Sequence, residues 1–272
     1  MIRFISFTSG SCGNCSLLLR VPEDPLALPT GVLIDAGISL RRLRKELQLV
    51  GLDTACLRAV LVTHDHMDHI RHLGSFCKRL SLPVYTTSVL HRALERHPFT
   101  AEYIPSCRKD MGAGVWNTVA EGFDVQYFVV PHDATQTVGF AIRSDGHNFV
   151  LMTDLGSVTP EGMAFAREAD TVVVESNFDV DMLLGGDYPY ELKMRICRGY
   201  GHLSNDACAE AIRSFWHPGL KNLFLCHLSA NNNTPRLAYD NAAQTLRELG
   251  VDPADVHLRV LPRDVSTPLL TL

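Results

Sequence analysis

The sequence predicts an α/β fold in which two mixed β-sheets are flanked by helices, an αββα sandwich. Predicted helices and strands interleave in two halves of the chain, as this architecture requires. Several short apolar runs rich in Val, Ile and Leu are typical of buried strands. Five of these runs end in an acid or a histidine, namely Asp35, His64, His132, Asp154 and His227. We expect their loops to converge at one edge of the fold and to form an active site there.

Length and composition fit one soluble folded unit. The chain has 272 residues, of which 46% are hydrophobic, so it can bury a substantial core, and we expect a single domain over residues 1–272. It carries 25 basic and 30 acidic side chains, a formal charge of −5. Strong electrostatic DNA binders usually have a basic excess, so bulk charge gives no support for nucleic acid binding. Two bound divalent ions would nevertheless create a local positive charge.

The first half of the chain begins with a predicted hairpin, in which the Gly/Ser/Asn turn 8–15 connects strand 2–7 to residues 16–20. Further apolar runs predict strands at 32–35, 59–62 and 83–86. Amphipathic spacing predicts helices at 40–51, 70–80 and 88–96. Ser39 should cap the first of these helices and Gly51 should end it, while the arginines on its outer face are expected to be solvated.

The second half repeats the alternation after residues 98–122, which show little periodicity and are expected to be loop with one short strand. The predicted strands cover 123–130, 137–143, 148–153, 170–175, 222–226 and, as the last strand, 257–261. Asp145 and Gly146 form a favoured hairpin turn between the second and third of them. Helices are expected at 204–216 and 236–249.

The segment Arg58 to Ile70, RAVLVTHDHMDHI, has the pattern of a strand that delivers metal ligands. On an extended segment His64 and His66 project to the same side, whereas on a helix they would lie about 200° apart. Asp68 and His69 follow at the start of a predicted helix. A solvated polar loop is the plain alternative, but it would have to gather five titratable groups in six positions without a task. Neutral imidazoles with carboxylates suit Zn²⁺ or Mn²⁺.

THDHMDH resembles the HxHxDH signature of the metallo-β-lactamase fold, a hydrolase superfamily with two metal ions between two β-sheets. The resemblance implies that His64, His66 and His132 hold one divalent ion. It implies that Asp68, His69 and His227 hold the other, that Asp154 bridges the two, and that Asp35 orients a ligand histidine. Two ions about 4 Å apart would lower the pKa of a shared water from ~15.7 towards neutrality, so the expected reaction is hydrolysis.

Residues outside the ligand set must choose the substrate, because thioesterases of the glyoxalase II kind share all seven ligand positions. GHLSN precedes a predicted helix and places His202 beside backbone amides that favour an anion. We therefore expect Asp68, Asp154 and His202 to be the catalytic residues. The candidate phosphate contacts come from GHLSN and from the similar box HLSANNN, and they are Ser204, Asn205, Ser229 and Asn231. A helix cap at Ser204 or Asn205, with His202 incidental, is the alternative.

The chain resembles one branch of the superfamily, the YycJ/WalJ-like proteins. The resemblance rests on the metal motif together with SGSCGNC, PHDA, TDLG, ESNFD, YPYELKMRI, GHLSN and HLSANN. The resemblance implies a DNA exonuclease acting 5′ to 3′, with DNA rather than RNA as substrate. The extra β-CASP domain of related nucleases is not expected, because Asp154 and His227 are only 73 positions apart. Phe178 departs from the branch, in which we expect histidine, and the role of that histidine is in doubt here.

Three other functions remain open. A thioesterase would need a pocket for the acyl carrier, which glyoxalase II relatives build with an added C-terminal region, while 45 residues follow His227 here. An RNA-directed nuclease would use the same ligands, and a non-catalytic scaffold would not need all seven of them.

The cysteines and the N-terminus bear on compartment. Most of the eight cysteines lie in apolar patterns and are expected to be small buried residues. The exception is CGNC at Cys12 to Cys15, whose spacing allows redox or zinc use, although its Gly-rich context is unlike a thioredoxin-type helix start. Nothing resembles a signal peptide or a transmembrane run of ~20 residues. We expect a cytoplasmic protein with no membrane partner.

Overall fold

The computed structural model describes residues 1–24 and 26–272, and their contacts divide the chain into two compact units. The first contains residues 1–127, 142–147 and 262–272, and the second contains residues 128–141 and 148–261. The organisation as a single domain stays a prediction. Both sheets are mixed and seven-stranded.

The first sheet lies in the first unit and has the strand order β14-β1-β2-β3-β4-β5-β6. Its strands are β1 (Ile2–Gly10), β2 (Gly13–Arg20), β3 (Thr30–Ile34), β4 (Leu57–Leu61), β5 (Val84–Thr86), β6 (Arg108–Asp110) and β14 (Leu270–Thr271). Pairing is antiparallel from β14 to β3 and parallel from β3 to β6. Because β3 and β4 are parallel, Asp35 and the metal motif follow strands that end at the same edge.

The predicted hairpin at the N-terminus is present, but its turn is shorter than the composition suggests. Thr8 pairs with Cys15, Ser9 with Asn14 and Gly10 with Gly13, so only residues 11 and 12 form the turn. The backbone hydrogen bonds of the sheet override the turn preference of Gly, Ser and Asn at the other positions. Asn14 therefore lies on a strand.

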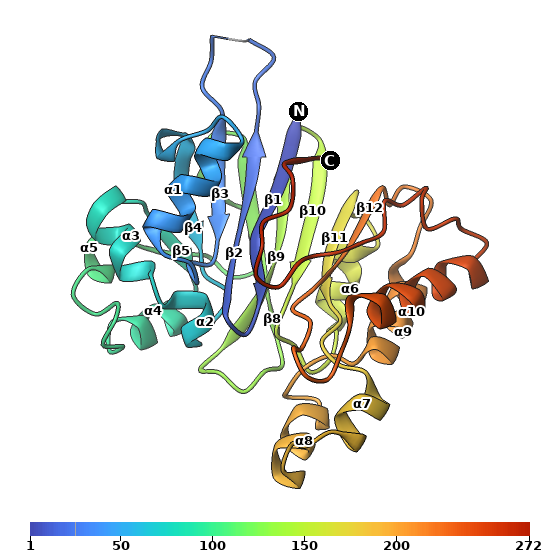
Figure 1. Ribbon diagram of the computed structural model, residues 1–272. Helices are drawn as coiled ribbons and strands as arrows, with labels where there is room; N and C mark the ends of the chain where they lie inside the picture. Colours follow the sequence, from blue (N-terminus) through green and yellow to red (C-terminus); the bar gives the residue numbers. More distant parts are fainter. Residues whose placement is uncertain (25) are drawn as a thin grey trace. The chain divides into compact units, whose positions relative to one another are not determined.

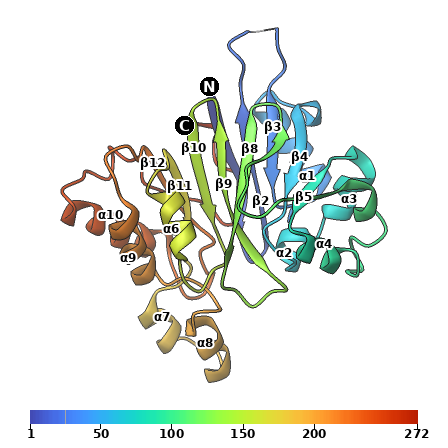
Figure 2. The same ribbon diagram turned by 180° about the vertical axis from the view of Figure 1, so that it is seen from behind.

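Helices α1 to α5 gather beside β3, β4 and β5 (Figures 1 and 2). They are α1 (Leu40–Leu49), α2 (Met67–Ile70), α3 (Leu73–Leu80), α4 (Ser88–Leu94) and α5 (Ile104–Cys107), and a 3₁₀ turn covers Thr54–Cys56. Ser39 caps α1 as predicted, because its side chain accepts a hydrogen bond from the amide of Arg42. Leu40, Leu43 and Leu47 turn inward to the buried core of this unit.

The predicted helix at 70–80 is wrong at its start, because two helices, α2 and α3, occupy this region. The backbone leaves the helical region at His72, whose amide donates to the carbonyl of Ala36. A tertiary hydrogen bond thus interrupts a continuous apolar spacing. Residues 98–122 also contain more than the expected short strand, since they form α5, β6 and β7.

The second sheet has the order β13-β12-β11-β10-β9-β8-β7. Its strands are β7 (Asn117–Ala120), β8 (Phe123–Val130), β9 (Thr137–Ser144), β10 (His147–Met152), β11 (Thr171–Glu175), β12 (Asn222–Cys226) and β13 (Arg259–Val260). The predicted turn between β9 and β10 is confirmed, with φ of 48° at Asp145 and 76° at Gly146. Strands β10 to β13 are parallel, so Met152, Glu175 and Cys226 end at one edge of this sheet.

Helices α6, α9 and α10 lie beside β11 and β12, and α7 and α8 extend beyond the sheet (Figures 1 and 2). Their bounds are α6 (Pro160–Ala166), α7 (Val180–Gly185), α8 (Tyr190–Cys197), α9 (Asn205–Phe215) and α10 (Pro235–Glu248). The sequence did not predict α6, α7 or α8, and the strand expected at 257–261 is followed by a further strand, β14. Among the residues described, no helix combines the length and apolar character needed to cross a bilayer.

Candidate metal centre and active site

Three of the five residues at strand ends adopt left-handed backbone conformations. The φ angles are 62° at Asp35, 53° at Asp154 and 53° at His227, and all three side chains are buried. This region is disfavoured for residues other than glycine, and such strain gathers at functional sites. The surrounding structure therefore fixes the direction of each of these side chains at a cost in backbone energy.

Asp35 holds one candidate ligand in a defined protonation state. Its Oδ1 accepts a hydrogen bond from the amide of Thr63 at 2.9 Å, and its Oδ2 accepts from the Thr63 hydroxyl at 2.8 Å. His69 Nδ1 lies 2.7 Å from the same Oδ2. Because a carboxylate only accepts, Nδ1 carries the proton and Nε2 of His69 carries the lone pair that a metal ion requires.

Asn14 completes this network, and no pattern in the sequence singles this residue out. Its Oδ1 accepts from the amide of Gly10 at 3.0 Å, which fixes the orientation of the amide group. Its Nδ2 therefore faces Nε2 of His69 at 2.8 Å and Oδ2 of Asp68 at 3.1 Å. Gly37 allows this approach, since a Cβ built there would lie 1.9 Å from the carbonyl oxygen of Asp68.

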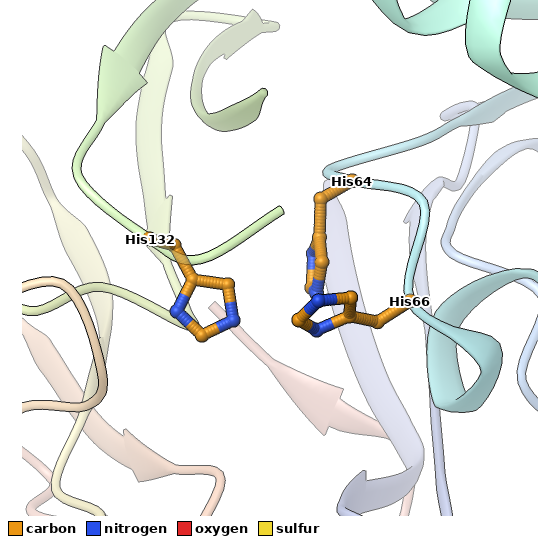
Figure 3. Close-up of side chains that lie close together, drawn as sticks. All are labelled: His64, His66 and His132. Atoms are coloured by element: carbon orange, nitrogen blue, oxygen red, sulfur yellow. The ribbon is translucent and has the colours of Figure 1, made fainter. Parts of the chain in front are cut away.

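The motif histidines gather as the spacing predicts. The ring centroid of His64 lies 4.7 Å from that of His66 and 4.0 Å from that of His69. His66 occupies the N-cap position of α2, and Asp68 lies in its first turn. Figure 3 shows His64 and His66 on the segment between β4 and α2. The first unit thus places three imidazoles and one carboxylate in one cluster.

His132 lies on the loop after β8, in the second unit, and is labelled in Figure 3. Its Nδ1 donates to the carbonyl of Gly201 at 2.7 Å, so Nε2 carries the lone pair. Burial lowers the pKa of His132 below its usual value, against the opposing charge of Asp154. A neutral imidazole is the form that binds a metal ion.

Asp154 and His227 belong to the same unit and lie close together. His227 Nδ1 is 3.4 Å from Oδ1 of Asp154, whose Oδ2 accepts from the Thr153 hydroxyl at 2.8 Å. Asn177 from the ESNFD box donates to the carbonyl of His227 at 2.7 Å. The strained backbone of His227 is therefore held by a side chain 50 residues away in the sequence.

Glu175 is a further candidate site residue that the sequence reasoning missed. It ends β11 and is fully buried, and its Oε1 lies 2.7 Å from Nδ1 of His202 and 3.1 Å from Nδ1 of His227. Its Oε2 accepts from the amides of Leu155 and Leu203 at 2.9 and 3.2 Å. The available signal is a strand that ends in an acid, which is also the pattern that predicts Asp35 and Asp154 as site residues.

The charges of Glu175 and His202 stabilise each other. Burial alone would raise the pKa of Glu175, but the charge of His202 and the hydrogen bonds from His202 and His227 bring the pKa below its usual value. Burial would lower the pKa of His202, but the charge and hydrogen bond of Glu175 raise it above its usual value. Asp154, Glu175, His202 and His227 each offer a ligand atom within 4.8 Å of the others.

The four candidate phosphate contacts have different surroundings. Ser204 is the N-cap of α9, and its hydroxyl accepts from the amide of Ala207. Asn205 is buried, with its side chain bonded to Ser176 and Asn233. The Ser229 hydroxyl accepts from the amide of Asn232 at 3.2 Å. Asn231 is exposed, and its Nδ2 donates to the hydroxyl of Tyr188 at 3.0 Å.

Phe178 and the double-cysteine loop supply no ligands in this arrangement. Phe178 is buried, and its backbone bridges to Ser204 through the amide of Asn205, which donates to its carbonyl at 2.8 Å. Cys12 is exposed in the β1–β2 turn, whereas Cys15 is buried. Both are free thiols, and burial raises the pKa of Cys15 well above its usual range.

Residues 30–227 match the family described as the Beta-lactamase superfamily domain. The chain is 31% identical over 269 residues to the exodeoxyribonuclease WalJ of Streptococcus pneumoniae serotype 2 (strain D39 / NCTC 7466), which covers 98% of this chain and 97% of that protein. It is 33% identical over 250 residues to the exodeoxyribonuclease YycJ of Bacillus anthracis, and this alignment covers 92% of this chain and 90% of that protein.

Among solved structures, Zn²⁺-bound PqqB from Methylobacterium extorquens superposes with a TM-score of 0.68 at 15% identity, covering 98% of this chain and all of the other. This likeness confirms the predicted fold class, two mixed sheets with flanking helices. The family match and the two near-full-length relatives confirm the resemblance first read from the motifs. The chain therefore belongs to the metallo-β-lactamase superfamily, in the branch of the WalJ and YycJ exodeoxyribonucleases.

Proposed function

We propose that this metal-dependent hydrolase is a dinuclear phosphodiesterase that degrades DNA as an exonuclease in the 5′ to 3′ direction. The two relatives named as exodeoxyribonucleases support DNA as the substrate. The observation that carries the phosphodiesterase assignment is the hydrogen bond between Glu175, at the end of β11, and His202, which shortly precedes α9. It places an oriented imidazole beside a helix N-terminus, where a phosphate anion is favoured.

The proposed ligands fit two divalent ions of the Zn²⁺ or Mn²⁺ kind. His69 and His132 each direct the protonated Nδ1 to an oxygen of the protein, so that Nε2 is the donor atom. In our assignment His64, His66 and His132 hold one ion, Asp68, His69 and His227 hold the second, and Asp154 contacts both. When bound, such ions supply Lewis acidity and an activated water for hydrolysis.

We assign His202 to the substrate phosphate and not to a metal ion. Its Nδ1 donates to Glu175, which fixes the ring, and its side chain remains 24% exposed, so the other edge of the ring can reach a ligand. A donor that is held in place before the reaction can stabilise charge that develops on a phosphate oxygen. Glu175 is then a positioning residue for His202.

The remaining phosphate contacts in this proposal are Ser204, the cap of α9, together with Ser229 and Asn231. Asn205 is not carried into this proposal, because its buried amide joins the GHLSN box to the HLSANNN box through Asn233. Its contribution is to hold the two boxes together.

The test is a nuclease assay with DNA and RNA labelled at either end, with Mn²⁺ and with Zn²⁺. We expect release of labelled nucleotides from 5′-labelled DNA at the first time points. His202→Ala should lower kcat on DNA about a hundredfold, since one such donor contributes about 3 kcal/mol. The variant should keep its metal content, because His202 is not a ligand in our assignment, whereas its melting temperature should fall, because the buried Glu175 carboxylate loses its charged partner.

His217→Ala is the matched control, because His217 follows the opposite end of α9. It should leave kcat unchanged. If metal content falls together with activity in His202→Ala, then His202 is a ligand and our assignment is wrong. If DNA is stable and a thioester is hydrolysed, the acyl-hydrolase function replaces the nuclease.

A further inference from the structure

Helices α1 and α3 border an open hollow of about 730 Å³ on the surface of the first unit. Four cationic side chains line it, three from α1 and one from α3, which are Arg41, Arg44, Lys45 and Arg79. All four residues are exposed. Two neutral hydrogen-bonding side chains, Gln48 and Ser75, complete the polar lining. Segments about thirty residues apart in the sequence thus bring their positive charges to one place.

The charge of this hollow opposes that of the whole chain. Its lining carries four positive charges and no carboxylate among the residues described, whereas the protein has a formal charge of −5. Glu46 is the acid of α1, and its carboxylate lies 3.8 Å from Arg42. The acid therefore pairs with a cation that does not line the hollow, and the four lining charges can act together on a polyanion.

The cations of α1 also lie where they disfavour the helix. Arg41 is in the first turn of α1, which contains no acid, so the positive end of the helix dipole faces a positive side chain. Arg41 is three residues from Arg44 and four from Lys45, spacings at which like charges repel on a helix surface. The sequence pattern predicts solvated arginines on this face, and Arg41 and Arg44 are exposed. Together with Lys45 they form a cluster of cations, and the repulsion between like charges at these spacings is expected to lower the stability of the helix.

We propose that the α1–α3 hollow binds the phosphodiester backbone of the DNA strand, at a place separate from the metal ligands. This inference rests on the proposed nuclease function and names a surface that retains its substrate. Several cations around an open hollow suit a chain of phosphates. Among the residues described, the only apolar side chain of the lining is Leu40, which is buried, so none is placed to enter a lipid bilayer. Helix α3 directly follows α2, which carries Asp68 and His69, so the surface belongs to the same segment as the metal motif.

The experiment measures binding of metal-loaded protein to a fluorescent single-stranded oligonucleotide with phosphorothioate linkages, which resist hydrolysis. We compare the wild type with the double variant Arg44→Gln, Arg79→Gln. Each lost phosphate contact should reduce the salt slope by about 0.7, so the double variant should bind roughly 20-fold more weakly at about 0.1 M salt. Its hydrolysis of bis(p-nitrophenyl) phosphate, which is too small to reach both sites, should match the wild type.

The control variant is Arg247→Gln, Arg259→Gln, which removes the same charge from exposed positions of the second unit. It should bind DNA within about twofold of the wild type. A third variant, Arg41→Gln, should weaken DNA binding while its melting temperature stays equal or rises, because it relieves the charge repulsion in α1. A cation with a purely structural role would give the opposite change in melting temperature.

Three results would overturn the inference. Unchanged DNA binding by the α1–α3 variant shows that the hollow is not used, and an equal loss in the control shows an effect of bulk charge. Loss of binding to anionic phosphatidylserine vesicles with unchanged DNA binding assigns the hollow to a lipid surface. If the wild type binds the oligonucleotide through this hollow but degrades no natural DNA, the inference stands and the proposed nuclease function fails.

Discussion

Asp35→Asn offers a sharp test of how the proposed metal centre is organised. The substitution preserves shape, and asparagine tolerates the left-handed φ of 62° at this position. Asp35 accepts hydrogen bonds from the amide and hydroxyl of Thr63 and from Nδ1 of His69. An asparagine has one acceptor oxygen and one NH₂ group, so in either orientation its NH₂ group faces a donor of Thr63 or His69.

The size of the effect on stability and on metal affinity depends on which way the asparagine side chain is oriented. If the NH₂ group faces the Thr63 amide, a buried donor loses its partner, which costs about 1–3 kcal/mol of folding free energy. If it faces His69, the histidine must move its proton from Nδ1 to Nε2, and Nε2 can then no longer bind a metal ion. Loss of such an orienting partner typically lowers metal affinity about 10–100-fold. We expect weaker binding of one ion and a melting temperature lower by a few degrees.

Competition with a chelator, followed by elemental analysis, measures the affinity of each ion. Asp53→Asn is the control, since Asp53 caps a 3₁₀ turn in the same unit and asparagine caps equally well. It should leave both ions and the melting temperature unchanged. Wild-type affinity for both ions in Asp35→Asn would refute the argument that Asp35 sets the tautomer of His69.

Three further predictions test the assignment. Asp154→Ala should disturb both ions, whereas His227→Ala should mainly release one, and equal undiminished occupancy by elemental analysis would contradict the bridging role. The double variant Cys12→Ser, Cys15→Ser should keep its metals and most of its nuclease activity, because one thiol is exposed in a turn and the other is buried and protonated; loss of an ion would restore a ligand role for CxxC. Glu175→Gln should lower kcat on DNA about tenfold or more, since a hydrogen bond to a charged group is stronger than one between neutral groups by about 1–1.5 kcal/mol. Unchanged steady-state kinetics would rule out a positioning role for Glu175.

Most strands and helices could be predicted because their apolar spacing, caps and turns are set by residues close together in the sequence. The run before His64, the cap at Ser39 and the Asp145–Gly146 turn depend on neighbours within a few residues. The predicted elements are wrong where contacts between residues distant in the sequence determine the local structure. The bond from His72 to Ala36 divides α2 from α3, and the pairing of β1 with β2 converts most of a Gly-rich loop into strand.

The sequence by itself determined the family, the candidate ligands and the reaction class expected of them, because a metal site needs particular side chains at strand ends and these stand in a fixed order. Only the tertiary structure brought Asn14 to His69, placed Glu175 between His202 and His227, and joined the cations of α1 and α3 around one hollow. The hydrogen-bonded contacts among these join residues 27 to 55 positions apart in the sequence. A side chain's type can be read from the sequence, whereas its partner depends on how the sheets and helices pack, which no local pattern specifies.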